Sequence, residues 1–271
     1  MELVDTHCHI HESGLHTASD DHTRQKWALA GNPTPTSLVA AAKKAGVTRM
    51  ICVGCTRADS QLAIQLASSQ TGCWASIGIH PHEAQMHNTA SEKAQFVALA
   101  TEFKVVSVGE CGLDYFYNHS PKSDQLAMLE FQLQLAMDRE LPVIFHVRDA
   151  YDDFWPVFRN FPGLSGVLHS FTDSMVHMER AVSEGLYIGV NGIATFTKDD
   201  AQQTMFKAIP LSKLLLETDA PYLTPTPVRG TINEPKNVTY ITQFLAELRG
   251  EPPEEIATAT TMNAVKLFGL M

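Results

Sequence analysis

The chain has 271 residues, 44% of them hydrophobic and 18% charged, which is an ordinary composition for a folded protein. Its 20 basic and 30 acidic residues give a net charge of −10, which argues against a broad basic surface for duplex DNA but does not exclude a small site that holds one strand end through cations. No apolar run reaches the ~18 residues of a membrane helix, no signal-peptide pattern opens the chain, and the five cysteines are scattered, so we expect a cytoplasmic protein with reduced thiols and no membrane partner.

Eight short segments rich in Val, Ile and Leu predict strands buried on both faces. In chain order they are residues 1–7, 49–55, 73–80, 104–111, 141–146, 165–171, 185–192 and 213–219. Amphipathic stretches separate most of them, and the clearest predict helices at residues 36–46, 58–69, 123–141 and 174–185. Eight βα units in this length predict an α/β fold, a single (β/α)8 TIM barrel in which residues 1–271 form one hydrolase domain. An open doubly wound sheet is the alternative, but its usual G-x-G-x-x-G fingerprint is missing after the first strand.

Polar residues lie at the same end of several predicted strands. Histidines and carboxylates close the first, third, fourth, fifth, sixth and eighth strands, and they are His7, His9, His80, Glu110, His146, His169 and Asp219. The carboxyl ends of barrel strands meet at one mouth, where barrel active sites lie. Imidazole and carboxylate groups gathered there predict a metal site.

Spacing within the first strand gives this prediction a physical basis. Residues i and i+2 of a strand point to one face, so His7 and His9 can bind one cation, whereas Cys8 points to the opposite face. A carboxylate such as Glu110 can bridge two cations about 3.5–4 Å apart, and such a pair lowers the pKa of a water molecule toward 7. Mixed imidazole and carboxylate ligands accept Mg²⁺, Mn²⁺ or Zn²⁺, so the metal identity stays open.

Six motifs in the chain resemble those of the TatD-type metal-dependent deoxyribonucleases, a branch of the amidohydrolase superfamily. They are DTHCH, GIHPH, GECGLDY, PVIFHVRDA, GVLHSFT and LLLETDAPYL, and the resemblance runs from residue 4 to about residue 269. It implies a TIM barrel with two divalent cations, one held by His7, His9, Glu110 and Asp219 and the other by Glu110, His146 and His169. Many amidohydrolases carry a carboxylated lysine at the bridging position, and Glu110 here favours the TatD branch.

The resemblance also implies roles beyond the metals. Asp219 would act as general base, and His80 and His82 would face the substrate, where His80 could protonate a leaving group. Arg148 could clamp a phosphate, although an ion pair with Asp149 or Asp152 is an equal alternative. Aromatic side chains after the fourth strand, Tyr115 and Phe116, could stack on a base or simply pack within a loop, and Asp114 could orient a neighbouring group.

The segment from residue 10 to residue 37 is longer than the matching connection of the family. It falls on the active face of the expected barrel, where loops set substrate choice. It could form a substrate lid, but an irregular surface loop is the favoured expectation. His11 continues the alternation of His7 and His9, but the chain should be turning there, so we do not expect His11 to be a ligand.

The resemblance predicts a metal-dependent enzyme that cleaves phosphodiester bonds in DNA, as a 3′–5′ exonuclease on single-stranded ends. We expect a monomer or a weak oligomer. One alternative keeps the metal site but cleaves a small ester, lactone or phosphoester, because one binuclear site serves many electrophiles. The other is a non-catalytic binding module whose metals are structural, which would require closed coordination.

Overall fold

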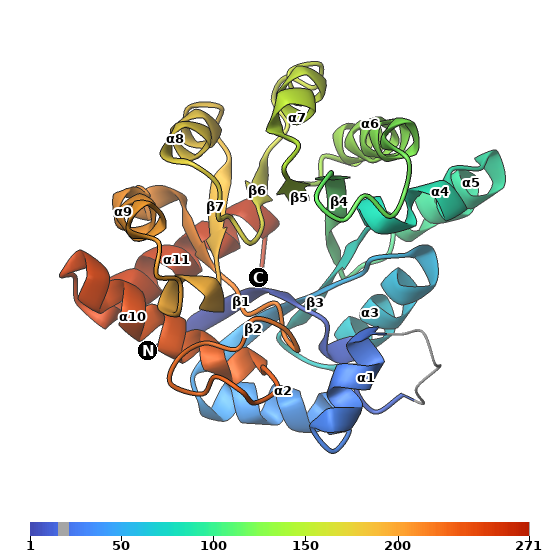
Figure 1. Cartoon of the computed structure of the whole chain (residues 1–271). Helices are drawn as coiled ribbons and strands as arrows, with labels where there is room; N and C mark the ends of the chain where they lie inside the picture. The colour runs from blue at the N-terminus through green and yellow to red at the C-terminus, as the bar shows by residue number, and fades with distance from the viewer. Residues whose placement is uncertain (16–21, 271) are drawn as a thin grey trace.

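The short apolar segments form eight parallel strands within residues 1–15 and 22–270, which are the residues that the computed structural model describes. Each strand pairs with the next along the chain, so the sheet order follows the sequence from β1 to β8 (Figure 1). The strands are β1 (Leu3–Cys8), β2 (Val47–Val53), β3 (Cys73–Ile77), β4 (Val105–Asp114), β5 (Val143–Arg148), β6 (Gly166–Leu168), β7 (Tyr187–Val190) and β8 (Leu214–Leu216).

The sheet closes between its last and first strands. The backbone N–H of Asp219 donates to the His7 carbonyl at 2.8 Å, and that of His9 donates to the Ala220 carbonyl at 2.8 Å. A parallel bridge joins Cys8 to Ala220. The predicted TIM barrel is therefore confirmed, and the doubly wound sheet is excluded.

Helices surround the strands as an outer ring (Figure 1). Those in the described residues are α1 (His22–Leu29), α2 (Pro35–Lys44), α3 (Arg57–Ser69), α4 (Ala84–His87), α5 (Ala90–Leu99), α6 (Lys122–Arg139), α7 (Tyr151–Phe158), α8 (Met175–Ser183), α9 (Asp200–Ala208), α10 (Val238–Arg249) and α11 (Pro253–Phe268). None of the helices in residues 1–15 and 22–270 has the length and apolarity needed to cross a membrane.

Two apolar layers hold the barrel together. The larger one lies between strands and helices, and it includes Cys8, which faces away from His7 and His9 as predicted. The smaller one fills the barrel interior with side chains such as Ile51 and Leu215, and Phe268 of α11 packs against them. The Thr261 hydroxyl of α11 also donates to the Glu2 carbonyl at 3.0 Å, just before β1 begins. Helix α11 thus covers the amino end of the barrel, and the carboxyl end is left for a site.

Several strand ends differ from the prediction. Strands β4 and β5 run on to Asp114 and Arg148, three and two residues beyond the predicted ends, while β3, β6 and β8 stop earlier. The Gln132 side chain of α6 accepts a hydrogen bond from the Ile79 N–H at 2.7 Å and donates one to the Ile79 carbonyl at 3.1 Å. Strand β3 ends early because these backbone groups of Ile79 bind a side chain instead of a neighbouring strand. His80, His169 and Asp219 consequently lie in the loops after their strands.

The expectation of an irregular loop over residues 10–37 is wrong in its described part. Residues Ile10–Glu12 form a 3₁₀-helix, and α1 follows at His22. Trp27 of α1 is fully buried and donates its indole N–H to the His9 carbonyl at 3.1 Å. This buried ring fastens α1 beside the end of β1. Residues 16–21 of the same segment lie outside the described residues.

Candidate metal centre

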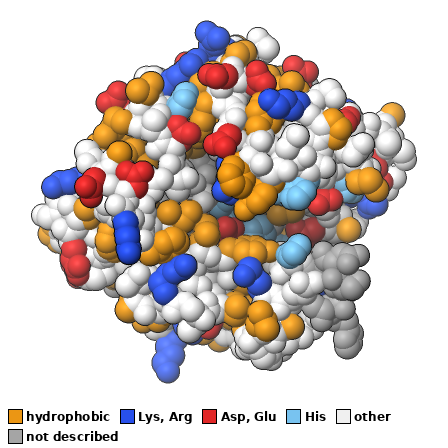
Figure 2. Space-filling model, viewed as in Figure 1, with side chains coloured by type: hydrophobic (Ala, Val, Ile, Leu, Met, Phe, Trp, Pro, Cys, Tyr) orange, Lys and Arg blue, Asp and Glu red, His pale blue; other side chains and the backbone are white. Residues whose placement is uncertain are grey.

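The face seen in Figure 2 is hollowed near its centre, and histidine and acidic side chains line the hollow. At its floor lies Glu110 of β4, which is only 4% exposed. Its Oε1 atom lies 2.8 Å from His146 Nδ1 and 3.6 Å from His169 Nε2, and its Oε2 atom lies 3.4 Å from His7 Nε2. One carboxylate therefore meets imidazoles from the ends of β1, β5 and β6.

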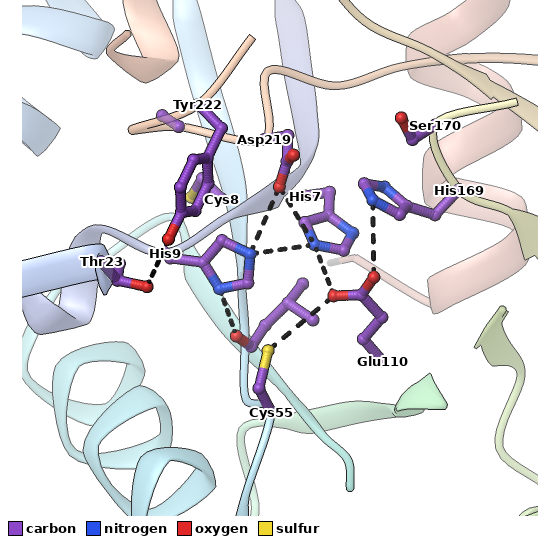
Figure 3. Close-up of polar contacts among 12 residues, drawn as sticks. His7, Cys8, His9, Thr23, Cys55, Glu110, His169, Ser170, Asp219 and Tyr222 are labelled. Atoms are coloured by element: carbon purple, nitrogen blue, oxygen red, sulfur yellow. Dashed lines mark hydrogen bonds and ion pairs between the residues drawn. The ribbon is translucent and has the colours of Figure 1, made fainter. Parts of the chain in front are cut away.

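A second group of donors forms where β1 and β8 meet (Figure 3). His7 Nε2 and His9 Nε2 point toward each other at 3.2 Å. Asp219 Oδ1 lies 3.3 Å from His9 Nε2 and 3.7 Å from His7 Nε2. Asp219 has a φ of +58°, a conformation that non-glycine residues rarely adopt. The hydrogen bond from its backbone N–H to the His7 carbonyl stabilises this conformation.

For three of these imidazoles the other nitrogen lies within 3.0 Å of a protein oxygen, although at His169 this contact does not have hydrogen-bond geometry. His9 Nδ1 lies 2.8 Å from the Val53 carbonyl, His169 Nδ1 lies 2.9 Å from Glu217 Oε1, and His146 Nε2 lies 3.0 Å from Asp114 Oδ2. Histidines that bind metals usually have such partners, which fix the ring orientation. Glu217 is not one of the predicted site residues, although its place two residues before Asp219 puts both side chains on one face of an extended strand.

The donor set fits divalent cations. Within the described residues four groups of three have possible ligand atoms within 4.8 Å of one another. Three lie around Glu110, namely His7, His9 and Glu110; His7, His169 and Asp219; and His80, Glu110 and His146, and the fourth is His9, His11 and Asp59. His80, which we expected to face the substrate, thus lies near the same carboxylate, with its Nε2 3.7 Å from Glu110 Oε1. His169 groups with His7 and Asp219. The His169 and His7 rings stack with their centroids 3.6 Å apart. A buried set of imidazoles and carboxylates is the ligand type that Zn²⁺ or Mn²⁺ takes.

The carboxylates of the site are ionised. Burial raises the pKa of Glu110, but the neighbouring charges of His169, His80 and His7 outweigh this and hold it well below its usual range. Burial likewise raises the pKa of Asp219, and the hydrogen bond with His9 together with the nearby histidine charges brings it below its usual range. Both groups can therefore accept a cation or a proton.

The imidazoles divide into two kinds. Burial lowers the pKa of His9, but the hydrogen bond and charge of Asp219 prevail and raise it to about 9. Burial also lowers the pKa of His169, but the negative charges of Glu217 and Glu110 outweigh it and raise the pKa to about 10. For His7 and His80 burial dominates, so the pKa of each lies below the ordinary value.

The predicted substrate contacts lie at the rim of this site. His82 Nε2 is 3.0 Å from Asp114 Oδ2, the same oxygen that His146 approaches. The Arg148 guanidinium lies over the rings of Phe116 and Tyr117, with its carbon 4.1 Å and 4.7 Å from the two ring centres. Among the described residues Arg148 makes these ring contacts and no ion pair with Asp149 or Asp152, the alternative considered above. The Tyr115 hydroxyl donates to Asp153 Oδ2 at 2.7 Å.

Two further contacts lie near the site. His11 is buried, and its Nε2 lies 2.8 Å from Asp59 Oδ1, so the turn after β1 leaves it close to His9 and Asp59. The hydroxyls of Thr23 in α1 and Tyr222 lie 2.9 Å apart beside His9 (Figure 3). Neither contact has a local sequence signal, because each joins residues far apart in the chain.

Comparison with known proteins gives concordant results. The family model described as TatD related DNase matches residues 4–269. The 3′-5′ ssDNA/RNA exonuclease TatD of Salmonella typhimurium is 39% identical over 241 residues, which is 85% of this chain and 91% of that protein. A TatD homologue of Escherichia coli K12 has a solved structure with a TM-score of 0.86 at 30% identity, covering 99% of this chain and 98% of the other. The solved structure of an uncharacterized amidohydrolase of Saccharomyces cerevisiae shares the fold, with a TM-score of 0.83 at 21% identity. The match covers 99% of this chain and 100% of the yeast chain.

Proposed function

Because the chain belongs to the family of TatD related DNases, we propose that it is a metal-dependent 3′–5′ exonuclease that hydrolyses phosphodiester bonds at single-stranded DNA ends. The observation that supports this best is the single buried carboxylate of Glu110 among imidazoles from three strand ends. The family favours this activity over hydrolysis of a small ester or lactone and over a non-catalytic binding module. In this proposal residues 1–271 act as one hydrolase domain, monomeric or weakly associated and cytoplasmic.

Two divalent cations complete the proposed site. His7, His9, Glu110 and Asp219 would hold one of them, and Glu110, His146 and His169 the other. Mg²⁺, Mn²⁺ and Zn²⁺ all accept such ligands. When bound, cations of this kind lower the pKa of water and neutralise charge on phosphodiester oxygens.

Asp219 is the proposed general base. Its low pKa keeps it ionised, so it can orient a water molecule and take its proton as the water attacks phosphorus. Its backbone is fixed by the hydrogen bond to the His7 carbonyl, which keeps the carboxylate at the junction of β1 and β8. Glu110, also ionised, lies among the imidazoles of His7, His146 and His169.

His80 is the proposed hydrogen-bond donor to the substrate. Its Nδ1 accepts the backbone N–H of His82 at 3.2 Å, so in the neutral ring the proton resides on Nε2. Nε2 lies 3.7 Å from Glu110 Oε1, beside the proposed metal ligands. From there the neutral ring can donate a hydrogen bond to a phosphate oxygen, and protonation of the leaving 3′ oxygen would require that His80 first gain a proton as an imidazolium. His82, Arg148 and Tyr115 are proposed to contact the strand, with Tyr115 offering its ring because its hydroxyl is bonded to Asp153.

A nuclease assay with a metal series tests the proposal. Purified protein loaded with Mg²⁺, Mn²⁺ or Zn²⁺ should shorten 5′-labelled single-stranded DNA from its 3′ end. Glu110→Ala and Asp219→Ala should each lower kcat roughly 100- to 10,000-fold, since each removes a group that acts in the reaction. Glu102→Ala, which removes an exposed carboxylate near the opposite end of β4, is the matched control and should keep the wild-type rate.

The same preparations separate the alternatives. Small esters, lactones and phosphoesters assayed beside DNA should be poor substrates. Wild-type rates in both the Glu110 and the Asp219 variants would refute this mechanism, and a lactone cleaved much faster than DNA would refute the substrate class.

A further inference from the structure

The loop that joins β4 to α6 presents two large aromatic side chains to solvent. Phe116 is 56% exposed and Tyr117 is 52% exposed, and Asn118 and His119 beside them are exposed too. The Tyr117 and His119 rings stack, with centroids 5.8 Å apart and planes 8° from parallel. Aromatic side chains usually gain free energy from burial, so a pair left open next to a hollow is typical of a binding surface.

Hydrogen bonds at both ends hold this loop in one arrangement. The Tyr115 N–H donates to the Arg148 carbonyl at 3.0 Å, which continues the pairing of β4 with β5. The Ser120 hydroxyl donates to the His82 carbonyl at 2.7 Å, and the Gln125 amide donates to the Ser120 carbonyl at 2.8 Å. The aromatic rings therefore stand on a fixed backbone, so a ligand need not order them on binding.

One carboxylate links this loop to the candidate metal centre. Asp114 Oδ1 accepts the Tyr117 N–H at 2.9 Å, while Oδ2 lies 3.0 Å from both His82 Nε2 and His146 Nε2. His146 in turn contacts Glu110 through its other nitrogen at 2.8 Å. Asp114 thus contacts both the loop that carries the exposed rings and the imidazoles of the site.

A cation completes the surface. The Arg148 guanidinium lies over Phe116 and Tyr117, as described above, and is carried by β5 two residues after His146. In a chain with a net charge of −10, this brings a positive charge to the rim of an acidic molecule. An aromatic face beside a guanidinium is the combination that binds a base and its phosphate in single-stranded nucleic acids.

We infer that Phe116 and Tyr117, whose rings meet edge to face with planes 89° apart, form an aromatic platform where a nucleobase close to the scissile 3′ end of a single strand stacks on one ring and contacts the other, with Arg148 on the adjoining phosphate. This inference rests on the proposed function and adds to it the part of the substrate that is recognised. Stacking accepts every base, so the platform predicts tolerance of sequence together with a requirement that a base be present. The platform is separate from the metal ligands and should act on substrate binding.

The test compares strands with and without bases near the 3′ end. The Phe116→Ala/Tyr117→Ala double variant should lower kcat/KM on a base-containing oligonucleotide by about 5- to 150-fold, mainly through a higher KM. On an oligonucleotide whose last three nucleotides are abasic, wild type and variant should be equally slow. The conservative variants Phe116→Tyr and Tyr117→Phe keep the rings and should lose less kcat/KM than the double alanine variant.

Phe103→Ala is the matched control. Phe103 is 92% exposed and precedes β4 at the opposite end of the strand, so its loss should leave both substrates unaffected. Metal content by elemental analysis should be equal in all variants. Undiminished activity of the double variant on base-containing strands, or an equal loss on both substrates, would overturn the platform while leaving the nuclease function intact. A wild-type protein that degrades neither strand would instead overturn the proposed function, and the platform with it.

Discussion

His9 and His7 are two residues apart and reach the same site, yet they hold protons differently. His9 faces the ionised Asp219, and its pKa rises to about 9, whereas burial lowers the pKa of His7. His169 is raised to about 10 by Glu217 and Glu110. In the metal-free protein near neutral pH, His9 and His169 are therefore protonated, and these protons satisfy the buried carboxylates that a cation would otherwise neutralise.

Metal binding should accordingly release protons. A ligating imidazole must be neutral, so a cation that takes His9 and His169 displaces about one to two protons at pH 7.5. Because both pKa values are raised, the competition by protons weakens as pH rises, and the apparent metal affinity should increase between about pH 7 and pH 9. Isothermal titration with Mn²⁺ in two buffers of different ionisation enthalpy measures the released protons directly.

His169→Asn supplies the control for this titration. It removes one of the two charged imidazoles, so fewer protons should be released. Binding enthalpies that do not depend on the buffer would show that no proton leaves and would contradict the charge assignment.

At the scale of an element, β4 and β5 together build one wall of the site. In their parallel register His146 lies opposite Gly112, between Glu110 and Asp114 on the neighbouring strand. The His146 ring can therefore contact Glu110 through Nδ1 and Asp114 through Nε2. The close approach of the two strands depends on glycine, since a Cβ at Gly112 would lie 1.8 Å from the His146 carbonyl oxygen.

Gly112→Ala should separate β4 from β5. The new methyl group meets backbone that cannot rotate away, so we expect a loss of at least about 1–3 kcal/mol in the free energy of unfolding and weaker metal binding. Gly163→Ala is the control: its φ is also positive, at +87°, but nothing lies within 4 Å of the added Cβ. Urea denaturation and metal content measure both effects. Equal behaviour of the two variants would show that the approach of the strands is unimportant.

At the scale of the whole molecule, the predicted ligands come from all around the barrel. They lie at the ends of β1, β4, β5, β6 and β8, so a bound cation would join strands that are distant along the chain. Helix α11 closes the other end of the barrel with Phe268 and its neighbours. Metal binding should therefore stabilise the barrel as a unit, because the unfolded chain presents no such site.

Chelation should consequently lower the midpoint of thermal unfolding. At a free metal concentration of 100 times Kd the linkage amounts to about 2.7 kcal/mol, which corresponds to roughly 5–10 °C for a chain of this size. Differential scanning calorimetry with Mn²⁺ and then with excess chelator measures the change. Glu110→Ala should lose most of the shift, and a wild-type midpoint unaffected by any divalent metal would contradict the metal site.

Features that depend on neighbouring residues in the chain could be predicted from the sequence, whereas features that depend on contacts between distant residues could not. Apolar segments such as residues 141–146 alternate with amphipathic ones, and this local pattern was enough to predict the barrel. The gathering of the strand-end histidines with Glu110 then followed, because parallel strands in a closed sheet end at one mouth. The early end of β3 was beyond local patterns, since it depends on Gln132, 53 residues from Ile79 in the chain.

The sequence by itself thus determined the barrel and the kinds of side chain at its mouth, because burial and strand alternation are local properties of the chain. The tertiary structure decided how those side chains are grouped: His80 beside Glu110 and His146, Glu217 behind His169, and Asp114 between His146 and the Phe116–Tyr117 loop. It also decided that α1 lies against His9 rather than extending as a loop. These arrangements arise after the strands leave the sheet, where contacts between distant residues replace the regular geometry of the ladder.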